Sequence, residues 1–141
     1  MRKPIILQRR EPPIPMPIIR RLAREIADKF KPNRIILFGS HARGEAGPDS
    51  DVDLLVVMPA ANEINQSIRI ESKISVDFPL DLLVRTPEML RKRLKWGDSF
   101  LLTVMEEGIV LYEKAHRRMG AKGRSRSRRR RSVVSSKAAG D

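Results

Sequence analysis

The chain has 141 residues and no cysteine, which leaves room for one domain with a buried core and excludes disulfides, zinc–thiolate sites and cysteine nucleophiles. No apolar run approaches the length that spans a bilayer, and the N-terminal apolar stretch is too short for a secretory signal. We therefore expect a cytoplasmic protein without membrane contact. The net charge of +12 is unevenly placed, because residues 114–141 hold 11 Lys and Arg against one acidic residue, whereas residues 1–113 hold 18 against 16.

The two ends of the chain differ in composition from its middle. Residues 1–16 contain four prolines and no hydrophobic period, so we expect an extended arm. Residues 114–141 form a basic, Arg/Ser-rich tail that we expect to be disordered when free. Arginine pairs with phosphate, so residues 117–131 predict weak, salt-sensitive contact with nucleic acid, although no aromatic residue there supports base stacking. A solvated tail without a partner is the alternative.

The central residues 17–113 alternate between helical and strand patterns, and Gly, Pro and Asn punctuate them. In chain order we expect helix 17–30, strand 34–38, a short helix within 41–46, strand 51–58, helix 63–75, strand 79–85, helix 87–96, helix 98–107 and strand 109–113. This order predicts one α/β domain of about 100 residues, with a small mixed β-sheet flanked by helices. Strand 51–58 is aliphatic throughout, which indicates a central strand that is covered on both faces.

Hydrophobic spacing also predicts which side chains the later helices bury. In helix 63–75 the buried stripe is expected to comprise Ile64, Ile68 and Ile74, with Ile70 out of phase. Thr86 is expected to cap helix 87–96, and Asp98 or Ser99 to cap helix 98–107. Helical spacing assigns four residues to the core, with a partner-binding surface as the alternative: Trp96, Phe100, Leu101 and Val104.

Polar residues flank two of the apolar strands: Gly39-Ser40 follows the first, and Asp51-Val52-Asp53 opens the second. Side chains two apart on a strand point the same way, so the two carboxylates repel unless a cation lies between them or one is protonated. All-oxygen ligation favours Mg²⁺, which usually completes its shell with water and substrate phosphates. Gly39 and Ser40 suit such phosphates, because glycine lets the backbone approach, amides at a helix start point outward and the hydroxyl can donate.

Two further residues extend this pattern. Arg43 lies one turn after Ser40 and can add a guanidinium to the phosphates. Asp81, at the head of strand 79–85, is the expected third carboxylate of a two-metal site, with Asp77 as second choice. Together these residues would hold a metal and a triphosphate, as phosphoryl or nucleotidyl transfer requires. The alternatives are a tight turn beside a polar strand edge, a loop acid at Asp81 and a solvated Arg43. The lone His41 has no assigned role.

The stretch "GSHARGEAGPDSDVDLLVV" resembles the signature of the nucleotidyltransferase superfamily related to DNA polymerase β: Gly-Ser, ten residues, Asp-x-Asp and a third Asp on a later strand. The form "FGSHARG…SDVDLLV" is similar to the minimal, MNT-type members, and the closing "FLLTVMEEGIVLYE" also resembles theirs. The resemblance covers about residues 18–113 and leaves out the arm and the tail. It implies a polymerase β-like nucleotidyltransferase fold that builds the nucleotide half alone, with the acceptor surface supplied by a partner.

The resemblance also implies residue roles: Asp51, Asp53 and Asp81 would bind the Mg²⁺ ions, and Gly39, Ser40, Arg43 and Ser50 would hold the triphosphate. The implied reaction moves NMP from an NTP, with AMP from ATP expected, to a hydroxyl and releases pyrophosphate. Many minimal members are antitoxins of HEPN-type ribonuclease toxins, and some modify a toxin tyrosine with AMP, so such a toxin is the expected partner. The alternatives are a catalytically idle antitoxin that acts by complex formation, and a nucleotidyltransferase that acts on an RNA 3′ end or a small molecule.

Overall fold

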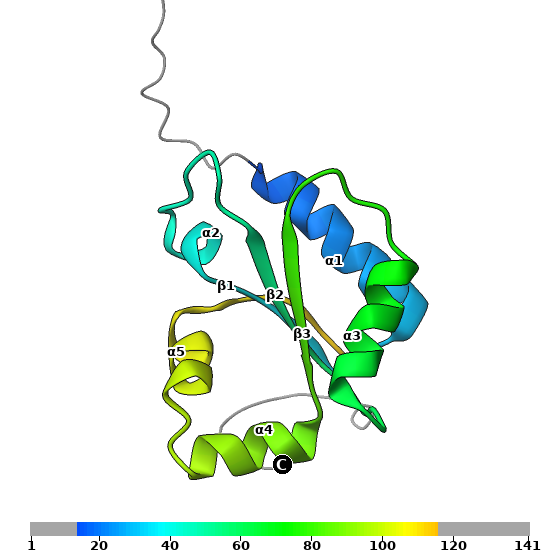
Figure 1. The fold of residues 1–141 in the computed structure, drawn as a ribbon, viewed down its shortest axis with the longest axis vertical. Helices are drawn as coiled ribbons and strands as arrows, with labels where there is room; N and C mark the ends of the chain where they lie inside the picture. The colour runs from blue at the N-terminus through cyan, green and yellow to red at the C-terminus, as the bar shows by residue number, and fades with distance from the viewer. Residues whose placement is uncertain (1–13, 116–141) are drawn as a thin grey trace, which may run out of the picture.

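A computed structural model describes residues 14–115, so the arm, apart from its last residues, and nearly all of the tail lie outside the described residues. Its elements are α1 (Met16–Phe30), β1 (Arg34–Phe38), α2 (Ser40–Arg43), β2 (Val52–Val57), α3 (Glu63–Ser72), β3 (Leu80–Arg85), α4 (Pro87–Lys95), α5 (Ser99–Glu107) and β4 (Ile109–Glu113) (Figure 1). The order of elements expected from the sequence is confirmed. No helix among residues 14–115 is long and apolar enough to span a membrane.

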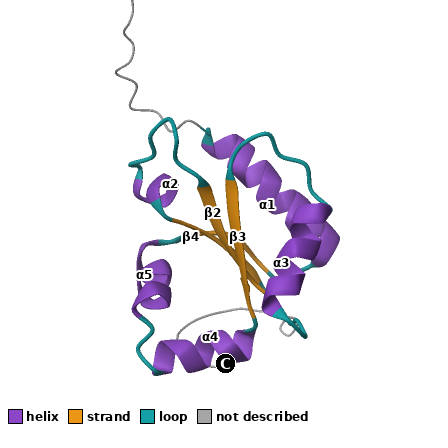
Figure 2. Cartoon of the chain, viewed as in Figure 1, coloured by secondary structure: helices purple, strands orange, loops and turns teal. Residues whose placement is uncertain are grey.

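The four strands form one mixed sheet, drawn in orange in Figure 2, and their order is β3-β2-β1-β4. β1 runs antiparallel to both β2 and β4, whereas β2 and β3 are parallel. The parallel pair needs a crossover, and α3 supplies it. β2 lies inside the sheet and is buried from Leu54 to Val57, which confirms the central strand expected from its aliphatic run.

Helices cover both faces of the sheet, and each face has its own apolar core. The first core joins α1, Ile70 of α3 and one face of the strands; its fully or nearly fully buried members include Ile19, Ile26, Ile35, Leu37, Leu54 and Val56. The second core joins α4 and α5 to the other face; its buried members are Ile36, Phe38, Leu55, Val57, Leu90, Leu101 and Val104. Alternate residues of β1 and β2 enter opposite cores, as the two-residue period of a strand requires.

Side-chain caps begin α4 and α5. Thr86 Oγ1 accepts a hydrogen bond from the Met89 amide at 3.1 Å, as the sequence predicted. Of the two candidates for the next cap, Asp98 takes the role, since its Oδ1 accepts from the Leu101 amide at 3.0 Å. Gly97 adopts φ +85° between the two helices, a conformation that favours glycine. The corner between α4 and α5 is therefore fixed locally.

The buried stripe expected for α3 is wrong at two of its three positions; the third, Ile74, lies after the end of α3 and is partly buried against the first core. Ile70, judged out of phase, is completely buried, whereas Ile64 and Ile68 are 72% and 58% exposed. The helix packs against β3 with the face that contains Ile70, and Ile64 and Ile68 lie on the solvent side. Polar residues occupy other positions of the packed face, so hydrophobicity alone chose the wrong phase.

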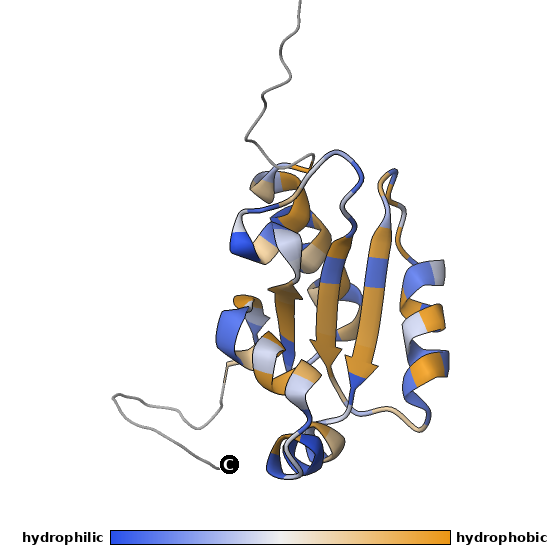
Figure 3. Ribbon diagram, turned by 60° about the vertical axis from the view of Figure 1, so that its left-hand side comes forward, coloured by the Kyte–Doolittle hydropathy of each residue, from blue (hydrophilic) through white to orange (hydrophobic). Residues whose placement is uncertain are grey.

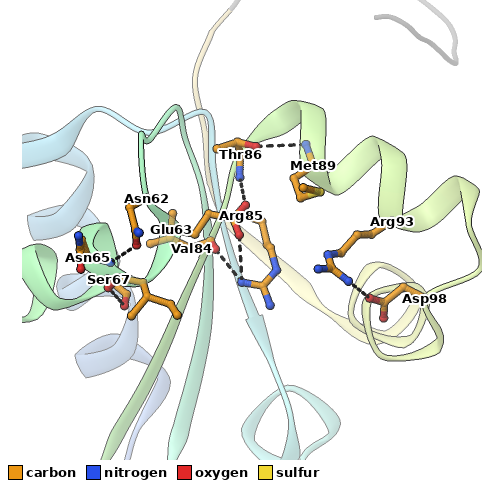
Figure 4. A network of polar contacts seen from close by, with 11 residues as sticks. Asn62, Glu63, Asn65, Ser67, Val84, Arg85, Thr86, Met89, Arg93 and Asp98 are labelled. Carbon is orange, nitrogen blue, oxygen red and sulfur yellow. Dashed lines mark hydrogen bonds and ion pairs between the residues drawn. The ribbon is translucent and has the colours of Figure 1, made fainter.

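A polar network explains how a charged residue can occupy the packed face of α3. Glu63 accepts a hydrogen bond from the Thr86 amide at 3.0 Å and lies 3.8 Å from the Arg85 guanidinium (Figure 4). The Arg85 guanidinium also donates to the Val84 carbonyl at 2.8 Å. These contacts tie the start of α3 to the junction of β3 and α4. Burial of Ile70 and this network together set the rotation of the helix.

The core assignment for the last two helices is half right. Leu101 and Val104 are buried in the second core, as expected, but Trp96 and Phe100 are 69% and 45% exposed. Trp96 lies at the C-cap of α4, beyond its packed face. Phe100 precedes Leu101 by one position and packs only edge-on against Phe38, with ring centroids 5.5 Å apart. Adjacent positions on a helix differ in direction by about 100°, so Phe100 and Leu101 cannot face the core equally.

Gly108 joins α5 to β4 in a space too small for any side chain. An added Cβ would lie 2.5 Å from both Ile36 Cγ2 and the Val104 carbonyl oxygen. We therefore expect Gly108→Ala to lower the free energy of unfolding by about 2 kcal/mol, measured by urea denaturation. Gly47→Ala is the matched control, because nothing lies within 4 Å of a Cβ there. Equal stability of the two variants would contradict this packing.

Candidate active site

Asp53 and Asp81 lie side by side on the parallel strands β2 and β3. The register pairs the two residues directly, and Figure 3 shows a hydrophilic band at the same level on two neighbouring strands. Residues two apart share a face, so Asp53 lies on the face of Leu55, which enters the second core. Asp53 is partly buried and Asp81 is exposed, while Asp51 is exposed just before β2 begins. The two strands thus bring together carboxylates that are 28 positions apart in the sequence.

The surroundings of the Asp53 carboxyl group disfavour its charged form. Burial, followed by the nearby charges of Asp81 and Asp51, raises the pKa of Asp53 to about 6. Arg43 acts in the opposite direction and lowers it. Like charges that raise a carboxyl pKa are a sign of groups that share a small space. The charges of Asp51 and Asp81, both singled out from the sequence, therefore act on Asp53. Asp77, the second choice for the third carboxylate, is not among the charges that shift the pKa of Asp53.

The raised pKa of Asp53 predicts how the stability of the metal-free protein depends on pH. The folded-state pKa of Asp53, about 6, lies above the ordinary 3.8, so the folded protein holds the proton more tightly than the unfolded chain. The associated stabilisation is complete below pH 3.8 and is lost as the pH rises through about 6. At pH 7 we expect Asp53→Asn to be more stable than the wild type by about 1 kcal/mol, after allowance for solvent screening. Urea denaturation between about pH 4 and about pH 7, which spans the two pKa values, measures this difference in stability. Equal pH profiles for the two proteins would contradict the prediction.

The Gly39-Ser40 turn lies against the same carboxylate. Gly39 has φ +75° and ψ −159°, a region that is open to glycine almost alone, and precedes the single turn of α2. A Cβ on Gly39 would overlap Asp53 Oδ2 and lie 3.0 Å from Asp53 Cγ. The Gly39 carbonyl accepts from the amides of Ala42 and Arg43, at 3.1 and 3.2 Å. The amides of Ser40 and His41, which precede these two, have no partner within the helix.

Arg43 and Ser50 have protein partners at this end of the sheet. Arg43 Nε donates to Glu45 at 3.0 Å, and its guanidinium lies 3.8 Å from Glu107 at the end of α5. The hydrogen bond to Glu45 is the main cause that raises the pKa of Arg43. Ser50 Oγ accepts from the Gly47 amide at 2.8 Å, which closes the loop before β2. The Ser50 hydroxyl hydrogen remains available to a ligand.

The donor set fits a divalent cation that a nucleotide helps to hold. Among residues 14–115, no group of three or more His, Cys, Asp or Glu is placed so that it could hold a metal ion by itself. Mg²⁺ commonly takes only one or two protein carboxylates and completes its shell with water and phosphate oxygens. A carboxyl group whose pKa is raised by burial and by neighbouring negative charges, as that of Asp53 is, is one that a bound cation stabilises in its charged form. Asp51 and Asp53 are the pair that fits this role, with Asp81 beside them.

The structure adds one residue that the sequence did not single out. His41 is 4% exposed, and its Nδ1 lies 3.0 Å from the main-chain carbonyl oxygen of Asp51. The contact joins α2 to the residue before β2. A lone histidine in a short helix carries no spacing signal, and only the approach of these two segments in space reveals it.

The family relation follows from comparison with known proteins. A model of the nucleotidyltransferase domain matches residues 19–134, which include every candidate site residue. A relative from Methanocaldococcus jannaschii, named "Putative protein adenylyltransferase", is 36% identical over 97 residues, which cover 65% of this chain and 93% of the relative. The chain belongs to the nucleotidyltransferase domain family. A second M. jannaschii protein of the same name is 34% identical over 79 residues, 56% of this nucleotidyltransferase and 77% of the relative.

Two solved structures are similar to part of this chain. One is described as a putative nucleotidyltransferase from Sulfolobus solfataricus, with a TM-score of 0.48 and 20% identity over 72% of this chain and 80% of that one. The other is described as a toxin–antitoxin with AMP-PNP, with a TM-score of 0.49 and 22% identity over 67% of this chain and 73% of that one. Family membership rests on the domain match and on the M. jannaschii relatives.

Proposed function

We propose that this nucleotidyltransferase moves AMP from ATP to a hydroxyl group of another protein. The observation that carries the proposal is the placement of Asp53 beside both Asp81 and Gly39, at one end of the sheet. That placement puts carboxylates for a metal next to a turn suited to phosphates, within a chain of the nucleotidyltransferase family. The choice of AMP and of a protein acceptor is supported by relatives whose names include protein adenylyltransferase.

Each proposed role uses a feature of the described residues. The Gly39-Ser40 turn and the Ser50 hydroxyl bind the β- and γ-phosphates, and Arg43 adds positive charge. The exposed carboxylate of Asp81 accepts the proton of the acceptor hydroxyl. The acceptor oxygen then forms a bond to the α-phosphorus while the bond to pyrophosphate breaks, so the acceptor gains AMP and pyrophosphate leaves.

A divalent cation, Mg²⁺, is part of the proposal. Asp51 and Asp53 would hold it, with Asp81 as the third carboxylate of a two-metal arrangement. When bound, it supplies positive charge to the phosphate oxygens and lowers the pKa of an attacking hydroxyl. The raised pKa of Asp53 supports this role, because the cation would replace the proton that relieves the repulsion.

The proposed acceptor is a tyrosine of a HEPN-type ribonuclease toxin, which would make this chain the antitoxin of the pair. Support comes from the resemblance of residues 18–113 to minimal nucleotidyltransferases and from the protein adenylyltransferase names of the relatives. Modification of a tyrosine adds a bulky, charged group, which can inactivate a nuclease that must bind RNA.

A labelling experiment tests the acceptor. Purified full-length protein is incubated with Mg²⁺ and α-³²P-labelled ATP, with and without the protein encoded beside its gene, and the products are separated on a denaturing gel. We expect label on that protein, its loss when Asp51→Asn replaces the wild type, and a modified tyrosine by mass spectrometry. A stable complex without label would contradict transfer and favour an antitoxin that acts by binding. Label on RNA instead would contradict the protein acceptor.

A further inference from the structure

Among residues 14–115, His41 is the one polar residue that is buried, and the proposed chemistry does not use it. The residue is only 4% exposed, and it lies in α2, directly after Ser40. Its ring reaches across to the chain before β2, where Nδ1 lies 3.0 Å from the Asp51 carbonyl oxygen. The contact therefore joins the segment that would bind phosphate to the segment that carries the metal carboxylates.

The partner of the ring identifies one nitrogen that carries a hydrogen. A carbonyl oxygen can only accept, so Nδ1 carries the hydrogen and donates it. The other ring nitrogen, Nε2, is buried and has no hydrogen-bond partner among residues 14–115. A ring that served only to fill space would need no nitrogen at either position. The single hydrogen bond that His41 makes is thus directed at the main chain of Asp51.

We propose that His41 is a positioning residue, whose Nδ1–H holds the main chain of Asp51 and so sets the distance between the phosphate-binding turn and the carboxylates. The inference rests on the proposed function of this site. The β1–β2 register ends with Phe38 opposite Asp53, so it holds Asp53 beside the turn but does not reach Asp51. Among residues 14–115, Arg43 pairs with Glu45 and Glu107 and does not hold Asp51. Loss of the His41 bond would let the Asp51 main chain move while the β2 register from Val52 onward stays in place.

Two variants separate the hydrogen bond from the packing. His41→Phe keeps a planar ring of similar size and removes both nitrogens. His41→Asn is smaller but keeps an N–H close to the position of Nδ1. We expect the Phe variant to bind Mn²⁺ about tenfold more weakly than the wild type in the presence of an ATP analogue, by electron paramagnetic resonance. We expect the Asn variant to stay within about threefold of the wild type.

A second readout needs neither nucleotide nor metal. Long-range ¹H–¹⁵N spectra report which ring nitrogen of a histidine carries the hydrogen, and the chain has only two histidines, so His116→Ala leaves the His41 signal alone. We expect hydrogen on Nδ1. A ring with hydrogen on Nε2 and none on Nδ1 would overturn the proposal. A folded Phe variant with wild-type Mn²⁺ affinity, or an Asn variant as weak as the Phe variant, would also overturn it. Because neither readout requires transfer, failure of the proposed function is distinguishable from failure of the role of His41.

Discussion

Replacement of Asp53 by asparagine is expected to abolish nucleotidyl transfer, by on the order of 10³-fold, while the fold stays intact. Asp53 lies at the centre of the site: it pairs with Asp81 in the strand register and lies against Gly39. The charge of Asp51 also helps to raise its pKa. Asparagine keeps the shape of the side chain but cannot hold a cation as a carboxylate does. Transfer of label from α-³²P-labelled ATP, in the presence of Mg²⁺, measures the effect.

The matched control for this variant is Asp49→Asn. Asp49 is exposed in the loop before β2, close in sequence, and belongs to neither the register pair nor the turn. We expect this variant to transfer label at the wild-type rate. Asp53→Asn should also unfold at a higher urea concentration than the wild type at pH 7, so loss of activity would coincide with a gain in stability. An active Asp53→Asn protein would refute the assignment of the site.

Gly39→Ala is expected to have the next largest effect, on both stability and transfer. The residue has φ +75° and ψ −159°, and its Cβ would overlap the Asp53 carboxylate. Backbone strain and overlap together should lower the free energy of unfolding by about 3 kcal/mol. Because relief of the overlap must move either the turn or Asp53, transfer should fall at least about 100-fold. Urea denaturation and the labelling assay measure the two effects.

Gly44→Ala separates backbone strain from the overlap. Gly44 lies at the other end of α2 with φ +74° and has no atom within 4 Å of an added Cβ. The variant should lose about 1 kcal/mol of stability through its left-handed backbone and keep wild-type transfer. If Gly39→Ala and Gly44→Ala proved equally active, the close approach of the turn to Asp53 would have no role in the reaction.

The sheet and its order of helices could be predicted from the sequence because local signals agree with one another. The aliphatic run of β2 predicted an inner strand, and Thr86 and Asp98 predicted where α4 and α5 begin. The spacing of Gly39-Ser40 and Asp51-Val52-Asp53 was also sufficient to place the candidate site at one end of two strands. Parallel pairing of β2 with β3 then brings Asp81 beside Asp53, as a carboxylate at the head of a later strand suggested.

Other features depend on contacts that no local pattern encodes. The rotation of α3 was wrong because the buried face includes Glu63, which pairs with Arg85, while the apolar Ile64 and Ile68 remain exposed. Helical spacing assigned Trp96 and Phe100 to the core, but both are exposed. Trp96 lies at the C-cap of α4, and Phe100 points in a different direction from the buried Leu101 beside it. His41 was missed since its partner is a main-chain carbonyl ten residues later.

The most direct test of the central claim compares two preparations of ATP, each labelled at a different phosphate. Wild-type protein, Mg²⁺ and the protein encoded beside its gene are incubated with ATP labelled either at the α-phosphate or at the γ-phosphate. Nucleotidyl transfer keeps the α-phosphorus on the acceptor and releases the γ-phosphorus in pyrophosphate. We therefore expect the acceptor to carry label from α-labelled ATP alone, and Asp53→Asn to remove it. Label from γ-labelled ATP, or equal labelling by Asp53→Asn, would contradict an NMP transferase whose site is formed by Asp51, Asp53, Asp81 and the Gly39-Ser40 turn.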